Sequence, residues 1–252
     1  MSGEGSRSAG VAAYYDKAAG IVPEFTVLNY GFSSDEPSIV DPGNPEQYCL
    51  RLYEHTVRHT KLGGATVLEV SCGRGGGAEW LWNTFGPARY VGLDLSEENI
   101  RIAKADRHGP EFGLGNAEAL PFPDAEFDVV INIEASHLYE DRRRFFAEVL
   151  RVLKPGGHFC YTDGCWANDD CTRDLLDAGF ELRERREITS NVIAALERDS
   201  KRREALFDTM AADDDLRREY KDWGGVVGYR AYRRFVDRET LYFSHWLVKP
   251  GA

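Results

Sequence analysis

One stretch of the sequence, residues 65–82, constrains the fold more than any other. Residues 66–70 are a short apolar run with β-branched side chains, and four of the five residues 73–77 are glycine. Residues 78–82 then have the composition of a helix start. A strand, a glycine-rich turn and a helix in this order open many nucleotide-type sites in α/β sheets. Because glycine adopts positive φ and lets a ligand approach bare backbone, the stretch predicts such a site at the end of a strand.

The rest of the chain alternates predicted strands with predicted helices. Helices are indicated by apolar residues at helical spacing, as in residues 46–59 and 141–153. An alternation of this kind favours an α/β fold built on a doubly wound, mostly parallel, seven-stranded sheet. The strands are predicted at residues 66–70, 89–94, 111–114, 127–133, 158–163, 180–189 and 241–248.

The chain divides into five parts. Residues 1–10 are rich in Ser and Gly and are expected to form a disordered tail. Residues 59–190 hold the predicted ligand-binding core, and residues 238–252 supply a C-terminal strand that completes its sheet. Residues 11–58 and 191–237 lie outside the sheet, and we expect a helical lid segment and a helical cap insertion there. The charged run within the insertion, from Glu197 to Arg218, is interpreted as a solvated helical surface.

The acidic composition limits the partners of the chain. Its 252 residues carry a formal net charge of −11, whereas proteins that bind nucleic acids need a basic surface. The five cysteines have no CxxC spacing, and no apolar run suggests a secretory leader or a membrane span. We therefore expect a cytoplasmic protein with reduced thiols that acts on a small molecule, without nucleic acid or a membrane span. The oligomeric state stays open, with a homodimer as one option.

Polar residues near the turn indicate which ligand it binds. Glu69 precedes the glycines, and a carboxylate pointing at the turn would repel a pyrophosphate but suit an ammonium or sulfonium group. Asp94 ends the second strand about 20 residues on, like the acid that binds a ribose diol. Asn116 and Glu118 follow the third strand, where polar groups could bind adenine. Ser71 replaces the first glycine of the dinucleotide pattern GxGxxG, so we expect adenosine joined to an amino-acid-like or cationic group.

Five blocks, in order and at family spacing, then carry a resemblance. They are VLEVSCGRG at 67–75, GLDLS at 92–96, GNAEALPFPD at 115–124, FDVVI at 127–131 and VLKPGG at 152–157. The chain resembles the class I S-adenosylmethionine-dependent methyltransferases, which implies their Rossmann-like fold. EVSCGRGGG at 69–77 and EASH at 134–137 are most similar to actinobacterial small-molecule O-methyltransferases. Among these are mycobacterial phthiotriolone/phenolphthiotriolone dimycocerosate methyltransferases, with fatty-acid methyltransferases as relatives. The family usually has glycine at position 71, and Ser71 matches the subgroup.

The resemblance implies S-adenosylmethionine as cofactor and S-adenosylhomocysteine as product. Glu69 and the Gly73 backbone would hold the methionine end, Asp94 the ribose, and Leu95 the adenine. Residues 116–118 would bound the adenine pocket, and 133–134 would close the methionine side. The implied cofactor residues are Glu69, Ser71, Gly73, Gly75, Asp94, Leu95, Asn116, Ala117, Glu118, Ile133 and Glu134.

The resemblance also points to a catalytic pair. Small-molecule members often place a histidine after the fourth strand and an acid after the fifth, here His137 and Asp163. Histidine titrates near neutral pH and can take a proton from a hydroxyl acceptor. Asp163 would orient His137 or act as the base itself. The structural alternatives are a hydrogen-bonded or helix-capping histidine and an acid that caps the next helix.

Aromatic residues outside the sheet are candidates for acceptor binding. The predicted substrate residues are Tyr14, Tyr15, Tyr30, Trp223 and Tyr229, together with His137, although a core role is an alternative for the aromatic side chains. No metal is expected, because His55 and His59 are spaced i, i+4 on a helix but lack an evident third ligand. These two histidines are interpreted as part of a solvated helix face.

We therefore expect a methyltransferase that methylates a hydroxyl of a small, partly apolar acceptor. The acceptor would be a natural product or lipid (polyketide, phenolic or glycosylated), for example in antibiotic biosynthesis. The alternatives within enzymes are carboxylate, N- or C-methylation. From another class, the protein could bind the cofactor without transferring its methyl group, as a regulatory module or as a fold reused for a cyclisation.

Overall fold

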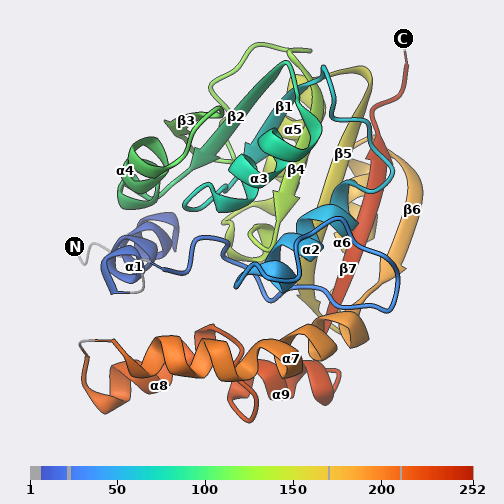
Figure 1. Cartoon of the computed structure of the whole chain (residues 1–252). Coiled ribbons are helices and arrows are strands. Elements are labelled where there is room, and N and C mark those ends of the chain that lie inside the picture. Colours follow the sequence, from blue (N-terminus) through green and yellow to red (C-terminus); the bar gives the residue numbers. More distant parts are fainter. Residues whose placement is uncertain (1–6, 22–23, 170, 211, 252) are drawn as a thin grey trace, which may run out of the picture.

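A seven-stranded sheet forms the centre of the computed structural model, which describes residues 7–21, 24–169, 171–210 and 212–251 (Figure 1). The strand order is β3-β2-β1-β4-β5-β7-β6. The first five are parallel, and β7 is antiparallel to both of its neighbours. The predicted fold class is confirmed. The strands are β1 (Thr66–Val70), β2 (Arg89–Asp94), β3 (Glu111–Leu114), β4 (Phe127–Ile133), β5 (Leu153–Trp166), β6 (Glu181–Glu187) and β7 (Thr240–Val248).

Helices cover both faces of this sheet. The α-helices are α1 (Arg7–Ile21), α2 (Gln47–Val57), α3 (Gly76–Phe85), α4 (Glu97–Asp106), α5 (Arg142–Val152), α6 (Cys171–Asp177), α7 (Thr189–Asp208), α8 (Asp214–Trp223) and α9 (Arg230–Val236), and a short 3-10 helix spans Ser136–Leu138. Val67 packs in the core cluster that contains residues of α2 and α3, whereas Leu68 packs with residues of α5 and α6. Alternate residues of β1 thus enter opposite layers, which explains why the strand carries apolar side chains on both faces.

The strand order reverses between β1 and β4. Ligand sites in open α/β sheets form at such a switch point, outside the carboxyl ends of the strands. The glycine turn after β1, the end of β2 and the segment after β4 all meet there. The topology therefore places the sequence-predicted residues at one edge of the sheet.

Helix α1 begins earlier than expected. It starts at Arg7, so the predicted disordered tail is wrong for residues 7–10, while residues 1–6 lie outside the described chain. The backbone N–H of Ser8 donates to Glu140 at 3.0 Å, and the Arg7 guanidinium donates to the carbonyl of His137 at 3.1 Å. These contacts fix a segment whose composition alone suggests disorder.

The prediction that His55 lies on a solvated face is also wrong. Its side chain is buried, stacks on Phe32 at 4.2 Å and lies 3.0 Å from the hydroxyl of Ser244. Burial lowers the pKa of His55 to about 3, so the ring is neutral. His59, four residues on, is partly exposed and pairs with Glu184.

Helices α7, α8 and α9, called the cap, lie together at the carboxyl end of the sheet, with α1 between α8 and α4 (Figure 1). Among the described residues, no helix is long and apolar enough to cross a membrane. The cap connects β6 to β7, so it is an insertion between two paired strands. Its first helix, α7, starts at Thr189, two residues before the predicted boundary.

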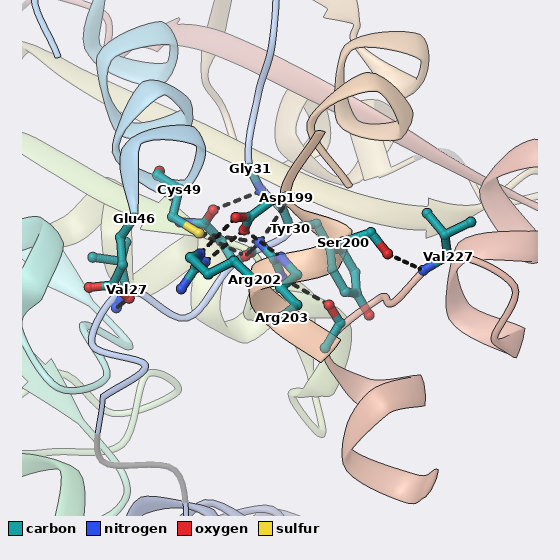
Figure 2. A network of polar contacts seen from close by, with 12 residues as sticks. Val27, Tyr30, Gly31, Glu46, Cys49, Asp199, Ser200, Arg202, Arg203 and Val227 are labelled. Atoms are coloured by element: carbon teal, nitrogen blue, oxygen red, sulfur yellow. Dashed lines mark hydrogen bonds and ion pairs between the residues drawn. The ribbon is translucent and has the colours of Figure 1, made fainter. Parts of the chain in front are cut away.

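A fully buried arginine joins the cap to the N-terminal segment. Arg203 of α7 donates to the carbonyls of Gly224 at 2.8 Å, Asn29 at 3.0 Å and Tyr30 at 3.3 Å, and it pairs with Asp199 at 2.8 Å (Figure 2). Such carbonyls need a donor because an unpaired buried polar group is destabilising. The interpretation of the charged run as a solvated surface is therefore wrong for Arg203 and Asp199, which are buried.

We predict that Arg203→Met lowers the free energy of unfolding by about 3–5 kcal/mol, as expected for breaking a buried ion pair. The carbonyls of Asn29, Tyr30 and Gly224 would lose the guanidinium donor. Arg202→Met is the matched control, because Arg202 pairs with the same Asp199 but is partly exposed, and it should change stability by at most about 1 kcal/mol. Urea unfolding measures both variants. Equal losses of unfolding free energy in the two variants would contradict the role of Arg203 as the anchor of the cap.

Candidate functional site

The glycine turn after β1 has a conformation that ordinary side chains would strain. Ser71, Gly73 and Gly75 all have positive φ, at 61°, 56° and 73°. A Cβ on Gly75 would lie 2.6 Å from the ring of Phe112, so this position excludes a side chain. The turn therefore brings bare backbone to the end of the sheet.

Asp94 joins this turn to the end of β2. One carboxylate oxygen accepts from the backbone N–H of Gly73 at 2.8 Å, and the other accepts from that of Ser96 at 2.9 Å. Burial raises the pKa of Asp94, while these hydrogen bonds and one from Asn99 favour the ionised form. The turn and the first residues before α4 thus share one anchoring carboxylate.

A cleft lies over the turn. Most predicted cofactor residues line it, namely Ser71, Gly73, Asp94, Leu95, Asn116, Ala117, Glu118, Ile133 and Glu134. The opposite wall comes from α1, which contributes Ser8, Val11 and Tyr15. The cleft has a free volume of about 80 Å³ because α1 covers it. It is called the cofactor cleft below.

Glu69, within β1, and Gly75, within the turn, are absent from the residues that line the cleft. The Glu69 carboxylate is buried and accepts from the hydroxyls of Tyr53 at 2.6 Å and Tyr90 at 2.7 Å. Burial raises the pKa of Glu69 to about 7, although both hydrogen bonds favour its ionised form. Its carboxylate thus links α2, β1 and β2, and its predicted contact with a cofactor stays a prediction.

The sequence did not reveal several residues of the cleft. Asn99 lines it, and its Oδ1 atom is buried without a hydrogen-bond partner within the described chain. Tyr139 bonds the Ser71 hydroxyl at 2.7 Å and the amide of Asn132 at 2.9 Å. Asn99 could have been predicted from its position, because it lies in the first turn of α4, three residues after Ser96. This helix directly follows Asp94, the acid expected to bind the ribose.

The structure brings His137 and Asp163 together. His137 Nδ1 lies 2.7 Å from Asp163 Oδ1, so the ring N–H donates to the carboxylate. The other carboxylate oxygen accepts from the Ser136 hydroxyl at 2.7 Å and from the His137 backbone N–H at 3.0 Å. The histidine side chain is 40% exposed and the aspartate side chain 2%. A buried carboxylate therefore holds a histidine whose ring remains accessible.

The interaction between His137 and Asp163 stabilises the charged form of each group, so it raises the pKa of the histidine and lowers that of the aspartate. Burial lowers the pKa of His137, but the charge and hydrogen bond of Asp163 outweigh it, so the pKa lies above the ordinary value of 6.5. Burial likewise raises the pKa of Asp163, and the charge of His137 with the hydrogen bonds lowers it below 3.8. The carboxylate is thus ionised at neutral pH.

Two further cavities meet at His137. The first, called the aromatic cavity, has a volume of about 340 Å³, and the predicted Tyr14, Tyr15, Tyr30 and Trp223 line it. The second, called the polar cavity, has a volume of about 580 Å³. Tyr229 precedes α9, packs against the core and is not among the residues that line these cavities.

Glu134 fixes the wall between the cofactor cleft and these cavities. It has a positive φ of 52°, and its Oε2 accepts from the Tyr30 backbone N–H at 2.9 Å and from the Tyr242 hydroxyl at 2.5 Å. Burial raises the pKa of Glu134 to about 7, against the effect of these hydrogen bonds. The residue after β4 thereby positions Tyr30 in the aromatic cavity.

Comparisons with known proteins identify the family. The profile of the family described as "Methyltransferase domain" matches residues 68–161. The fatty-acid O-methyltransferase of Mycolicibacterium smegmatis is 38% identical over 234 residues, covering 89% of this chain and 83% of that protein. The phthiotriol/phenolphthiotriol dimycocerosates methyltransferase of Mycobacterium tuberculosis is 41% identical, covering 90% and 86%. The chain belongs to the class I S-adenosylmethionine-dependent methyltransferases. The sequence resemblance is confirmed.

Solved structures agree on the fold. The [4+2]-cyclase SpnF superposes with a TM-score of 0.75 at 21% identity, over 97% of both chains. The cyclopropane synthase MmaA2 from Mycobacterium tuberculosis gives 0.74 at 14% identity, over 98% of this chain and all of that one. Identities this low show the architecture alone. The same methyltransferase scaffold thus extends over nearly the whole chain.

The residues of the cofactor cleft fit S-adenosylmethionine, which is the cofactor of this methyltransferase. The Asp94 carboxylate ends β2 where a ribose diol is bound in this type of fold. A Cβ on Gly73 would approach Leu28 to 3.2 Å, so the bare backbone leaves room at the turn. The unpartnered Oδ1 of Asn99 offers an acceptor to a ligand donor. Within the described chain, no cluster of His, Cys, Asp and Glu is suited to hold a metal ion.

We expect α1, which forms one wall of the cofactor cleft, to move when the cofactor binds, because ligand sites usually have about 300–1,000 Å³. Its contact with α4 is polar: Asp16 accepts from the Ser96 hydroxyl at 2.5 Å and from the Glu98 backbone N–H at 3.1 Å. An anion at a helix N-terminus is favourable, so this contact holds α1 over the cleft.

We predict that Asp16→Ala raises the dissociation rate of S-adenosylhomocysteine about fivefold or more, since hydrogen bonds worth about 1 kcal/mol are lost from the closed form. Stopped-flow displacement measures the rate. Lys17→Ala is the control, because the neighbouring Lys17 is exposed on the same helix. An unchanged rate in Asp16→Ala would show that α1 does not gate the cleft.

Proposed function

We propose that this enzyme methylates a hydroxyl group of a small, partly apolar, lipid-like or natural-product acceptor. The observation that carries the proposal is the His137–Asp163 pair on the wall of the aromatic cavity. Glu134 and Leu138, on either side of His137, line both that cavity and the cofactor cleft. A hydroxyl beside His137 would therefore lie next to the cofactor site.

When bound, S-adenosylmethionine supplies a sulfonium methyl group for in-line transfer, which depends on close alignment. The chain supplies the proton acceptor. Because the Nδ1–H of His137 donates to Asp163, the neutral ring leaves Nε2 free to accept the hydroxyl proton. Asp163 is the positioning residue: it holds the ring and stabilises the imidazolium that forms.

The chemistry of the aromatic cavity supports an apolar acceptor group. Tyr14 stacks on Tyr220, and Tyr15 makes an edge contact with Trp223, so α1 and α8 build one continuous apolar wall. The relatives named for fatty acids and for phthiotriol compounds support the same class of acceptor. We propose that α1 and the cap together form the lid that excludes water from this acceptor.

Methylation of a carboxylate is the alternative that one observation favours. The Arg7 side chain lines both the aromatic and the polar cavity, and its recorded hydrogen bonds go to backbone carbonyls. An acidic acceptor could pair with it. A carboxylate is already ionised above its pKa and needs no base, so the role of His137 separates the two functions.

We predict that His137→Gln lowers kcat on a hydroxyl acceptor by at least about 100-fold, the usual contribution of a general base. Affinity for S-adenosylhomocysteine should change little, because His137 does not line the cofactor cleft. Radiolabelled methyl transfer over matched alcohols, phenols and fatty acids, with calorimetry for the cofactor, measures both. Near-normal turnover of an alcohol or phenol in the variant would exclude His137 as the base.

The His137–Asp163 pair also predicts how kcat/KM depends on pH. The base works only when deprotonated, and the folded pKa of His137 lies above 6.5, so kcat/KM should rise with pH through a midpoint above 6.5. Asp163→Asn removes the charge that raises this pKa, so the midpoint should move to lower pH while kcat falls. A pH profile of kcat/KM for both proteins tests this. A profile that is flat for the wild type would favour a carboxylate acceptor.

A further inference from the structure

The polar cavity has no part in the mechanism above, yet it meets the aromatic cavity at the catalytic pair. The two cavities share Arg7, Tyr30, Glu134, His137 and Leu138. A molecule whose reacting hydroxyl lies at His137 therefore has space on two sides. The aromatic cavity is lined largely by aromatic side chains and the polar cavity by charged ones, so the two ends of the acceptor should differ in polarity.

Paired charges form one wall of the polar cavity. Arg142 donates to both oxygens of Asp169 at 2.9 and 2.8 Å and to Asp174 at 2.7 Å. Arg143 donates to the other oxygen of Asp174 at 2.8 Å. Each carboxylate thus has a guanidinium partner. Across the whole cavity both signs of charge are mixed, because the arginines Arg7, Arg142, Arg143 and Arg234 and the carboxylates Glu134, Glu140, Asp141, Asp169 and Asp174 all line it. Such a lining offers hydrogen-bond donors and acceptors with little net charge, so it suits a neutral hydroxyl-rich group better than a phosphate or an ammonium.

An exposed tryptophan stands beside this wall. Trp166 ends β5 and is 50% exposed, although tryptophan is usually well buried. The Arg234 guanidinium lies over one face of its ring, 4.8 Å from the centre, so a ligand would pack on the opposite face. Asp169, three residues after Trp166, lines the same cavity. A pyranose ring has a face of C–H groups that packs on a flat aromatic ring, and hydroxyls at its edge that bond planar amide, carboxylate and guanidinium groups.

We infer that the polar cavity is a subsite for a neutral sugar ring. The acceptor is then an amphiphilic glycoside, with its apolar part in the aromatic cavity and its sugar in the polar cavity. The position of the methylated hydroxyl, where the cavities meet, rests on the proposed function. The sugar subsite itself does not rest on the proposed function, because Trp166 and Asp169 would bind a sugar ring whether or not a methyl group is transferred.

Binding of simple probes tests the subsite directly. The probes are the octyl β-glycosides of glucose, galactose and rhamnose, with 1-octanol as the matched compound without a sugar, and the protein is the full chain loaded with S-adenosylhomocysteine. Saturation-transfer NMR reports which probe protons touch the protein, and calorimetry gives the affinities. We expect transfer to the ring protons of at least one glycoside, which should bind about fivefold or more tighter than octanol.

Two variants locate the contact. Trp166→Ala and Asp169→Asn should each remove most of the advantage of that glycoside and leave octanol affinity within about twofold. Trp80→Ala is the control, because Trp80 of α3 lines neither cavity, and it should change neither affinity. Thermal unfolding checks that each variant is folded, and Trp166→Phe, which keeps an aromatic ring, should retain part of the advantage.

The outcomes separate the two proposals. If no glycoside shows ring-proton transfer, or if Trp166→Ala weakens octanol as much as the glycoside, the sugar subsite is wrong, whatever the methylation data show. If the glycoside binds through Trp166 but His137→Gln retains its turnover of alcohols, the subsite stands and the base assignment fails.

Discussion

The segments around the aromatic cavity depend on one buried guanidinium. Arg203 ties the cap to the backbone of Tyr30, whose N–H donates to Glu134, which in turn accepts from Tyr242 of β7. This chain of contacts links the cap, the N-terminal segment and two strands. Because Gly224 is held by the same guanidinium and follows Trp223, the walls of the aromatic cavity have a fixed separation. Without the arginine, three segments distant in sequence would have no common anchor.

The cofactor side is organised independently, around the carboxylate of Asp94. Its contacts reach the glycine turn and the start of α4, all within the parallel part of the sheet. The His137–Asp163 pair lies between the two halves, since β4 and β5 are adjacent and parallel and each contributes one residue just beyond or at its carboxyl end. The cofactor cleft, the aromatic cavity and the His137–Asp163 pair thus depend on separate anchors that meet at one edge of the sheet.

Sequence reasoning succeeded where the determining contacts are local. The strands and the glycine turn follow from apolar runs and from glycine spacing. The resemblance to the family supplied the pair of His137 and Asp163, which the parallel strands β4 and β5 bring together. Sequence reasoning failed where a residue type has an unusual environment. Arg203 looks like a surface arginine, yet its carbonyl partner at Asn29 is 174 residues away. The partners of Glu69 were not foreseen either, because its carboxylate accepts from tyrosines 16 and 21 residues away. Such partners become neighbours only through tertiary packing, which no local pattern encodes.

The position of the cap in the chain has an evolutionary consequence. It is inserted between β6 and β7, and these strands pair at its base, where Glu187 opposes Phe243. Its two ends are therefore close together, which is the arrangement that tolerates exchange of an inserted segment. Recombination at this junction would replace the cap wall of the aromatic cavity as one segment while the strands that carry the cofactor residues stay untouched. An incoming segment would also have to supply a donor for the carbonyls of Asn29 and Tyr30.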